Sequence, residues 1–394
     1  MKEKLIIKNF GPIGFVDLDL SKFNVLIGEQ ATGKSTVAKL LAVCRYFSYI
    51  KADSILSDQN RGYFLAGLVA WGLNESIQTD SYIYYECKDY SLTVEHEKID
   101  NFHSPLFLPT LKPLSKEFKS LLLELKKIMP KGKDPSSIDL MWKIPSSFYQ
   151  NDVAGVMDNP LYLRTERGLQ SIFSLGKSSI RNISDSLFNN LADIDQIARA
   201  FKTNTTIEPL GITYKNDDGR GYIRKKNQKK FLTIYNAASG YQSAIPIILS
   251  LKYYSEIRKK KKTFIIEEPE LNLFPTAQYE LVKFLAESSR FHNEILLTTH
   301  SPYIMTSLNN LMYAFKVGRG NKRVAVAGII EEKYWVNPEE VSAYILKYDK
   351  KAKGTVQENI TDKEGLLRVQ KIDEVSSSLN SEFDKIMNIE LNIS

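Results

Sequence analysis

Gly28-Glu29-Gln30-Ala31-Thr32-Gly33-Lys34-Ser35 is the stretch of sequence that decides the fold of this chain. It follows residues 23–27, an apolar run typical of a buried strand, and it precedes residues 36–43, which favour a helix. Strand, glycine-containing loop and helix in this order indicate a phosphate-binding loop. Gly28 and Gly33 let the backbone bend so that successive N–H groups face phosphates, and the helix N-terminus adds its positive end. The sequence therefore predicts an α/β fold of P-loop NTPase type.

Two side chains of this loop are expected to contact ATP and its metal ion. Lys34 is placed to reach the β- and γ-phosphates, and the Ser35 hydroxyl is placed to ligate Mg²⁺. A chance match within an ordinary loop is the alternative, and the flanking strand and helix argue against it. ATP and Mg²⁺ are therefore the predicted ligands.

A pair of acids follows a second apolar run. Residues 263–266 are typical of a parallel core strand, and Glu267 and Glu268 come directly after it, with Pro269 ending the strand. Ligands bind at the carboxyl ends of such strands. Glu267 is expected to hold the Mg²⁺ shell through water, and Glu268 to orient and deprotonate the attacking water. The alternative is a pair of solvated loop carboxylates.

A histidine and a short polar string complete the candidate site. Residues 294–299 form another apolar strand that ends at His300, which is placed to contact a γ-phosphate or to polarise the attacking water. Ser239-Gly240-Tyr241-Gln242 lies upstream of the acid strand, and residues 243–251 after it favour a buried helix. Alone, this string is common in loops. In this order, Ser239 and Gly240 are expected to bind a γ-phosphate with a hydroxyl, N–H groups and a helix N-terminus.

These motifs resemble those of ABC-type ATPases of the SMC and OLD (overcoming lysogenization defect) group, and within it the stand-alone AAA-family ATPases of bacterial anti-phage systems, such as the ATPase subunit of PARIS. The resemblance covers residues 1–45 and 160–394. It is carried by residues 5–13 as the first strand, 27–36 as the P-loop with Gln30 and Thr36, 267–275 as the acid segment and 300–302 as the switch histidine. It implies a mixed sheet with helices on both sides, and Ser239 and Gly240 acting on a second subunit's nucleotide.

The chain departs from the family pattern at three places. Phe274 stands where the family often has His, and residues 238–242 read Ala-Ser-Gly-Tyr-Gln in place of a form with two glycines. Residues 162–168 resemble a strand followed by an "ERG" element, in which Glu166 and Arg167 are the candidates for the Q-loop role. That role stays open.

Composition predicts a cytoplasmic protein without a membrane segment. The chain has 394 residues, a net charge of +7 and two cysteines, which argue against a disulfide framework and fit a reducing compartment. A strand is predicted almost from the first residue, so no signal peptide is expected. The longest apolar stretch, residues 63–73, is too short to span a bilayer.

The motifs divide the chain into four predicted regions. Residues 1–50 are the N-terminal part of the ATPase core, 51–160 a helical and β insertion, 161–330 the rest of the core, and 331–394 a polar C-terminal tail region. Expected elements are a strand at 81–85, a charged helix at 115–129, an amphipathic helix at 176–203 and an amphipathic stretch at 375–391.

Basic residues cluster in two runs. Six of them lie in a predicted β-hairpin, namely Arg220, Arg224, Lys225, Lys226, Lys229 and Lys230, and residues 258–262 form the other run. Such runs are commonly solvated loop ends. The alternative is contact with the phosphate backbone of DNA or another nucleic acid.

Together these features predict an ATPase that hydrolyses ATP at sites shared between two subunits, as a homodimer or higher oligomer. The residues after His300 carry no acidic cluster of the nuclease type, so a separate effector is expected, a nuclease such as a Toprim-type protein or a toxin in anti-phage defence. Two alternatives stay open: a nucleotide-gated scaffold with negligible turnover, and an SMC-like DNA-repair ATPase. The trigger, the effector and the oligomeric state beyond a pair are not specified by the sequence.

Overall fold

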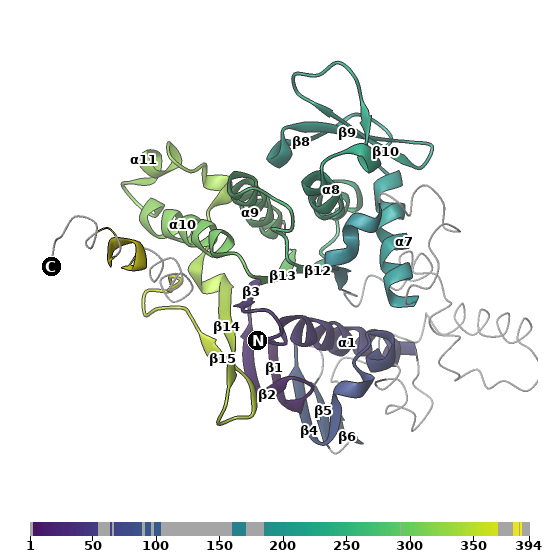
Figure 1. Cartoon of the computed structure of the whole chain (residues 1–394), viewed down its shortest axis with the longest axis vertical. Helices are drawn as coiled ribbons and strands as arrows, with labels where there is room; N and C mark the ends of the chain where they lie inside the picture. The colour runs from purple at the N-terminus through teal and green to yellow at the C-terminus, as the bar shows by residue number, and fades with distance from the viewer. Residues whose placement is uncertain are drawn as a thin grey trace, which may run out of the picture.

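The computed structural model describes residues 3–53, 64, 67–88, 91–95, 98–103, 160–170, 185–291, 293–368, 381–385 and 387. Its centre is an eleven-stranded sheet in the order β6-β5-β4-β1-β2-β15-β14-β3-β13-β12-β7 (Figure 1). The strands are β1 Glu3–Phe10, β2 Ile13–Leu20, β3 Phe23–Gly28, β4 Ile77–Glu86, β5 Ser91–Glu95, β6 Lys98–His103, β7 Leu161–Leu163, β12 Thr263–Glu267, β13 Glu294–Thr299, β14 Val341–Asp349 and β15 Gly354–Asn359.

The centre of the sheet is parallel and its N-terminal part is antiparallel. β3 pairs in parallel with β13 and β14, β12 pairs in parallel with β13 and β7, and β1 pairs in antiparallel fashion with β2 and β4. β3, β12 and β13 are buried along almost their whole length because both of their faces are covered. Their shared direction places their carboxyl ends at one edge, which is the edge that matters for function.

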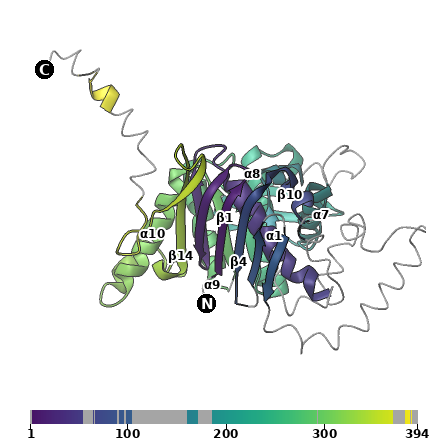
Figure 2. The same ribbon diagram turned by 90° about the horizontal axis from the view of Figure 1, so that it is seen from below.

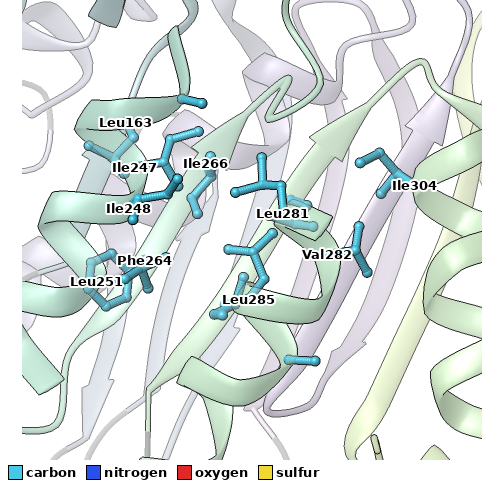
Figure 3. Packing of buried hydrophobic residues seen from close by; sticks show 14 of the residues in the cluster. Leu163, Ile247, Ile248, Leu251, Phe264, Ile266, Leu281, Val282, Leu285 and Ile304 are labelled. Atoms are coloured by element: carbon cyan, nitrogen blue, oxygen red, sulfur yellow. The ribbon is translucent and has the colours of Figure 1, made fainter. Parts of the chain in front are cut away.

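Helices cover both faces of the sheet and contact alternate side chains of each strand. The helices are α1 Lys34–Asp53, α7 Asp185–Arg199, α8 Ser239–Lys252, α9 Pro275–Arg290, α10 Pro302–Gly318 and α11 Arg323–Ala327. In β12, Phe264 and Ile266 belong to the cluster with α8 and α9, whereas Ile265 belongs to the cluster with α1 (Figure 3). This alternation is the period of two that a strand imposes. A mixed sheet with helices on both faces confirms the predicted α/β fold of P-loop NTPase type.

Part of the region predicted as an insertion continues the main sheet. β4 contains the expected strand at 81–85 and pairs with β1 through partners such as Ile7 and Ile83. β5 and β6 extend the same antiparallel ladder. Figure 2 shows β14, β1 and β4 in that order across the view. The expected helix at 115–129 lies outside the described residues, and the domain boundaries stay predictions.

The C-terminal region differs from the expected polar tail. β14 lies beside β3 near the centre of the sheet, and β15 pairs with both β14 and β2. Within β14, Ala343 and Leu346 are buried, whereas Lys347 and Tyr348 are exposed. The strand itself is mainly apolar, but the charged residues on either side, such as Glu339, Glu340, Lys350 and Lys351, made the region polar on average. The stretch at 375–391 lies almost entirely outside the described residues.

A second, four-stranded antiparallel sheet packs against α7. Its strands are β8 Thr205–Ile207, β9 Ile212–Asp217, β10 Arg220–Lys225 and β11 Leu232–Thr233. Ile194 and Ile197 of α7 share a cluster with residues of β9 and β10, so the described part of the predicted amphipathic helix uses its apolar stripe as core. Of the predicted basic cluster, Arg220, Arg224 and Lys225 lie in β10, and Lys226, Lys229 and Lys230 lie in the loop between β10 and β11. Among the described residues, none of the helices is long and apolar enough to cross a membrane.

Candidate nucleotide site

The loop between β3 and α1 has no room for larger residues at its glycines. A Cβ on Gly28 would lie 2.2 Å from the backbone oxygen of Leu346 in β14, and a Cβ on Gly33 would lie 2.7 Å from Ile13 Cδ1. Gly33 also has φ of +75°, which side chains disfavour. The loop therefore closes tightly on the neighbouring strands. Gln30 and Ser35 are exposed and Thr36 is half-buried, so the predicted contact residues face outward.

Lys34 lies at the first position of α1 with its ammonium group folded over the loop. It is only 6% exposed, and Nζ donates to the backbone oxygens of Gly28 at 2.9 Å and Glu29 at 2.7 Å. Burial lowers the pKa of Lys34, and the negative charges of Glu268 and Glu270 oppose that shift. Two carboxylates of the predicted acid segment therefore interact electrostatically with the lysine of the loop.

Glu267 ends β12 as a buried carboxylate. It is 4% exposed, and the hydroxyl of Tyr162 in β7 donates to its Oε1 at 2.8 Å. Burial is the main cause that raises the pKa of Tyr162, followed by the charge of Glu267, so the phenol stays protonated as the donor. The carboxylate therefore has a fixed orientation at the carboxyl edge of the sheet.

Glu268 adopts a backbone conformation that is unusual for a residue with a side chain. Its φ is +42°, and its N–H donates to the Thr298 oxygen of β13 at 2.8 Å. Left-handed conformations cost a non-glycine residue about 1–2 kcal/mol and persist where the surroundings hold them. The turn aims the half-buried Glu268 carboxylate at His300, with 3.5 Å between Oε1 and Nε2.

Glu270 holds the segment that carries His300. Its Oε1 accepts a hydrogen bond from Thr299 Oγ1 at 2.7 Å and one from the His300 N–H at 2.8 Å. The segment after β12 and the end of β13 are thereby joined. Sequence reasoning did not assign a role to Glu270, although it belongs to the quoted acid segment.

Arg167 is fully buried beneath the acid pair. Nη1 donates to the Glu267 oxygen at 2.7 Å, and Nη2 donates to the Glu268 oxygen at 2.7 Å. Burial lowers the pKa of Arg167 to about 10, so the guanidinium remains charged at neutral pH. At 0% exposure it has no free face for a nucleotide, which removes it as a Q-loop candidate. Glu166 is exposed, and its Q-loop role stays a prediction.

The signature string forms the first turn of α8 and is accessible from outside. Ser239 is exposed, whereas Gly240 is half-buried against the segment after the acids. A Cβ on Gly240 would lie 2.7 Å from the Asn272 oxygen, and Asn272 Nδ2 lies 3.1 Å from Ser243 Oγ. Phe274, which stands where the family often has His, lies two positions after Asn272 and is 75% exposed.

The structure brings most of the predicted residues to one edge of the sheet. Gly28, Glu267 and His300 follow three adjacent parallel strands, and Lys34 is electrostatically linked to Glu268. Gly240 instead packs against the segment after the acids from the α8 side, and Ser239 beside it is exposed. Tyr162 and Glu270 are site residues to which sequence reasoning gave no role, and Arg167 was named only as a candidate for the Q-loop role. The "ERG" element was the one signal for Arg167.

The residues fit ATP with Mg²⁺. The loop offers a buried ammonium, a helix N-terminus and glycines against which a phosphate can pack. The described residues contain no group of three or more His, Cys, Asp or Glu suited to a metal ion. Mg²⁺ is commonly held by one or two protein groups together with phosphates and water, and Ser35 and Glu267 are the candidates for this role.

Comparisons with known proteins agree with this class of fold. A family model described as an AAA ATPase domain matches residues 133–305, less than half of the 394 residues, and supports an ATPase of this type. The match includes the signature string, the acid pair and His300. The comparison with curated proteins gives no match.

Three solved SMC head structures are also similar. One is the SmcHead bound to the C-winged helix domain of ScpA, at 10% identity and TM-score 0.46, covering 92% of this chain and 98% of that chain. The SMC head domain from Thermotoga maritima has 8% identity and TM-score 0.40, with coverage of 91% and 98%. The Smc head domain with an extended coiled coil bound to the C-terminal domain of ScpA, derived from Pyrococcus furiosus, has 10% identity and TM-score 0.42. The match covers 96% of this chain and 99% of that chain. Similarity at this level says nothing about activity or partners.

Proposed function

We propose that the chain hydrolyses ATP at sites shared between two subunits. The observation that carries the proposal is the pair formed by Glu268 and His300, 3.5 Å apart at the strand edge that also bears the phosphate loop. A carboxylate beside an imidazole can accept a proton from water and keep the water oriented. The electrostatic effect of Glu268 on Lys34 supports a common site.

In this mechanism each group has one task. Lys34 leaves the backbone oxygens of Gly28 and Glu29 to contact the phosphates, and Glu268 takes a proton from the attacking water. His300, whose Nε2 lies 3.5 Å from the Glu268 carboxylate, would contact the γ-phosphate or polarise the attacking water. Bound Mg²⁺ would neutralise phosphate charge, with the Ser35 hydroxyl as a ligand and the Glu267 carboxylate in its water shell.

A second subunit is part of the proposal because the signature turn packs on the segment after the acids through Gly240 and leaves Ser239 exposed to solvent. Ser239 is exposed at the N-terminus of α8, where free backbone N–H groups favour an anion. In the proposed dimer, Ser239 and Gly240 of one subunit contact the γ-phosphate held by the loop of the other. Phe274 directly follows Leu273, which lies against Gly240, and its side chain is 75% exposed. It is therefore expected at the contact between subunits.

Mixing two inactive variants tests the shared site. Ser239→Arg should bind ATP through its own loop and hydrolyse it poorly, because a long cation blocks the partner's γ-phosphate position. Lys34→Ala should lack ATP binding but keep an intact signature turn. An equimolar mixture should regain hydrolysis, because each mixed dimer holds one complete site. Steady-state phosphate release is the measurement.

The control mixes Lys34→Ala with Tyr235→Arg, which places the same cation on an exposed residue before the signature turn. Tyr235→Arg should hydrolyse ATP alone. A mixture of Ser239→Arg and Lys34→Ala that stays inactive, with both proteins folded and paired, would show that the site is not shared.

The wider role is proposed on the resemblance alone. A separate effector, such as a Toprim-type nuclease or a toxin in anti-phage defence, would be held or released as the ATP-bound dimer forms and hydrolyses. Copurification with the product of a neighbouring nuclease gene, lost when ATP is hydrolysed, would support it. DNA-stimulated hydrolysis would instead favour the SMC-like repair ATPase, and tight ATP binding without turnover would favour the nucleotide-gated scaffold.

A further inference from the structure

Arg167 contacts three separate parts of the site through its guanidinium group. Nε donates to the Ser243 oxygen in the second turn of α8 at 2.8 Å, and Nη1 donates to the Arg164 oxygen at 2.8 Å. Nη1 and Nη2 also donate to the Glu267 and Glu268 oxygens, both at 2.7 Å. One side chain thus connects the helix that bears the signature turn with the tip of the acid strand.

The geometry of this connection is rigid. A guanidinium group is planar, so its donors keep fixed directions relative to one another. Arg167 is 0% exposed, and water cannot easily replace a bond that is lost. A shift of the Ser243 oxygen must therefore either break a buried hydrogen bond or move the backbone of the acid pair.

A second contact joins the same two parts. Asn272 Nδ2 lies 3.1 Å from Ser243 Oγ, and the Asn272 oxygen leaves no room for a Cβ on Gly240. The start of α8 and the segment from Glu267 to Asn272 therefore form one packed unit. Of these two sets of contacts between α8 and the acid segment, the Arg167 bonds are the ones that reach the backbone of the acids themselves.

We propose that Arg167 is a positioning residue that couples the two ATP sites of the dimer. Because each signature turn acts on the partner's nucleotide, contact with that nucleotide shifts α8, and Arg167 carries the shift to the acid pair of its own subunit's site. The inference rests on the shared sites proposed above. It makes ATP at one site set the position of Glu268 at the other.

The test compares Arg167→Lys with wild type in hydrolysis and in binding. Wild type should show a sigmoidal dependence of rate on ATP. Arg167→Lys keeps the charge but loses the planar fork, so kcat should fall by about 10- to 100-fold, the range typical of groups that orient primary ligands. Its Hill coefficient should fall to about 1, because one site no longer senses the other. ATP affinity should stay within about twofold of wild type, since the phosphate loop is untouched.

Arg45→Lys is the matched control. Arg45 is another buried arginine, paired with Glu3 at a distance from the acid pair, so the substitution has a similar cost in burial. It should change thermal stability without changing the Hill coefficient. Arg167→Met, which keeps the length but removes every donor, should also lower the Hill coefficient to about 1, whereas a purely structural defect such as that of Arg45→Lys should leave it unchanged.

Binding isotherms with a fluorescent ATP analogue in the Glu268→Gln background report coupling without turnover. If the proposed hydrolysis is wrong, wild type will not turn over ATP. If the coupling is wrong, the binding isotherms will show no cooperativity, so the two failures can be told apart. If the Arg167 variants do not fold, Asn272→Gly loosens the same unit and suits the residue's φ of +61°. It should lower the Hill coefficient partway. An unchanged Hill coefficient in a folded Arg167→Lys, or in Asn272→Gly when the Arg167 variants do not fold, overturns the coupling.

Discussion

Glu268→Gln is expected to lower the rate of ATP hydrolysis by about 10²- to 10⁴-fold, the usual cost of losing a general base. The amide keeps the size of the side chain and its place 3.5 Å from His300 but cannot take a proton from water. ATP should still bind, because Lys34, Ser35 and Glu267 are unchanged. The backbone turn should also survive, since Arg167 and the Thr298 oxygen hold it through main-chain atoms.

Because ATP then persists between the subunits, the ATP-bound dimer should accumulate. Sedimentation velocity with ATP and Mg²⁺ would show the dimer, and phosphate release would give the rate. Glu280→Gln is the control, because Glu280 pairs with Lys283 on α9, away from the site. It should hydrolyse ATP normally. A wild-type rate in Glu268→Gln would refute the assignment of the base, whereas a wild type that binds ATP without turnover would favour the scaffold.

The parts of the site that the sequence predicts are those encoded by local patterns. The phosphate loop, the acid pair and His300 each lie at the end of a short apolar strand. Such a strand and the residues that end it can be recognised from a few neighbouring positions in the sequence. Their meeting at one edge follows from the parallel arrangement of those strands. The fold class was predictable for the same reason.

The parts that the sequence does not predict depend on contacts between distant residues. Arg167 donates to backbone carbonyl groups that lie 76, 100 and 101 positions away along the chain. Because every residue has a backbone carbonyl, the sequence does not indicate which of them Arg167 contacts. Glu270 resembles any loop carboxylate until Thr299 and His300 are placed beside it. β14 is mainly apolar and borders the phosphate loop at Gly28, but the charged residues just before and after it gave the whole region its polar composition.

Lys34→Ala is expected to weaken ATP binding by about 100-fold or more and to abolish hydrolysis at that site. A hydrogen bond to a charged group contributes about 1.5–3 kcal/mol, and the ammonium is expected to make more than one such contact with the phosphates. The group is already largely desolvated at 6% exposure, so moving it from the oxygens of Gly28 and Glu29 to a phosphate costs little further dehydration. Equilibrium binding of a fluorescent ATP analogue measures the loss.

Lys39→Ala provides the control, because Lys39 is a half-buried lysine farther along α1. It should bind ATP as wild type does. Lys34→Ala itself must be shown to fold, since it leaves the backbone oxygens of Gly28 and Glu29 without this donor. Thermal unfolding gives this evidence, and so does the recovery of hydrolysis when Lys34→Ala is mixed with Ser239→Arg. Unchanged affinity in a folded Lys34→Ala would mean that the loop does not hold the phosphates. The pair of Glu268 and His300, 3.5 Å apart, would then need another substrate.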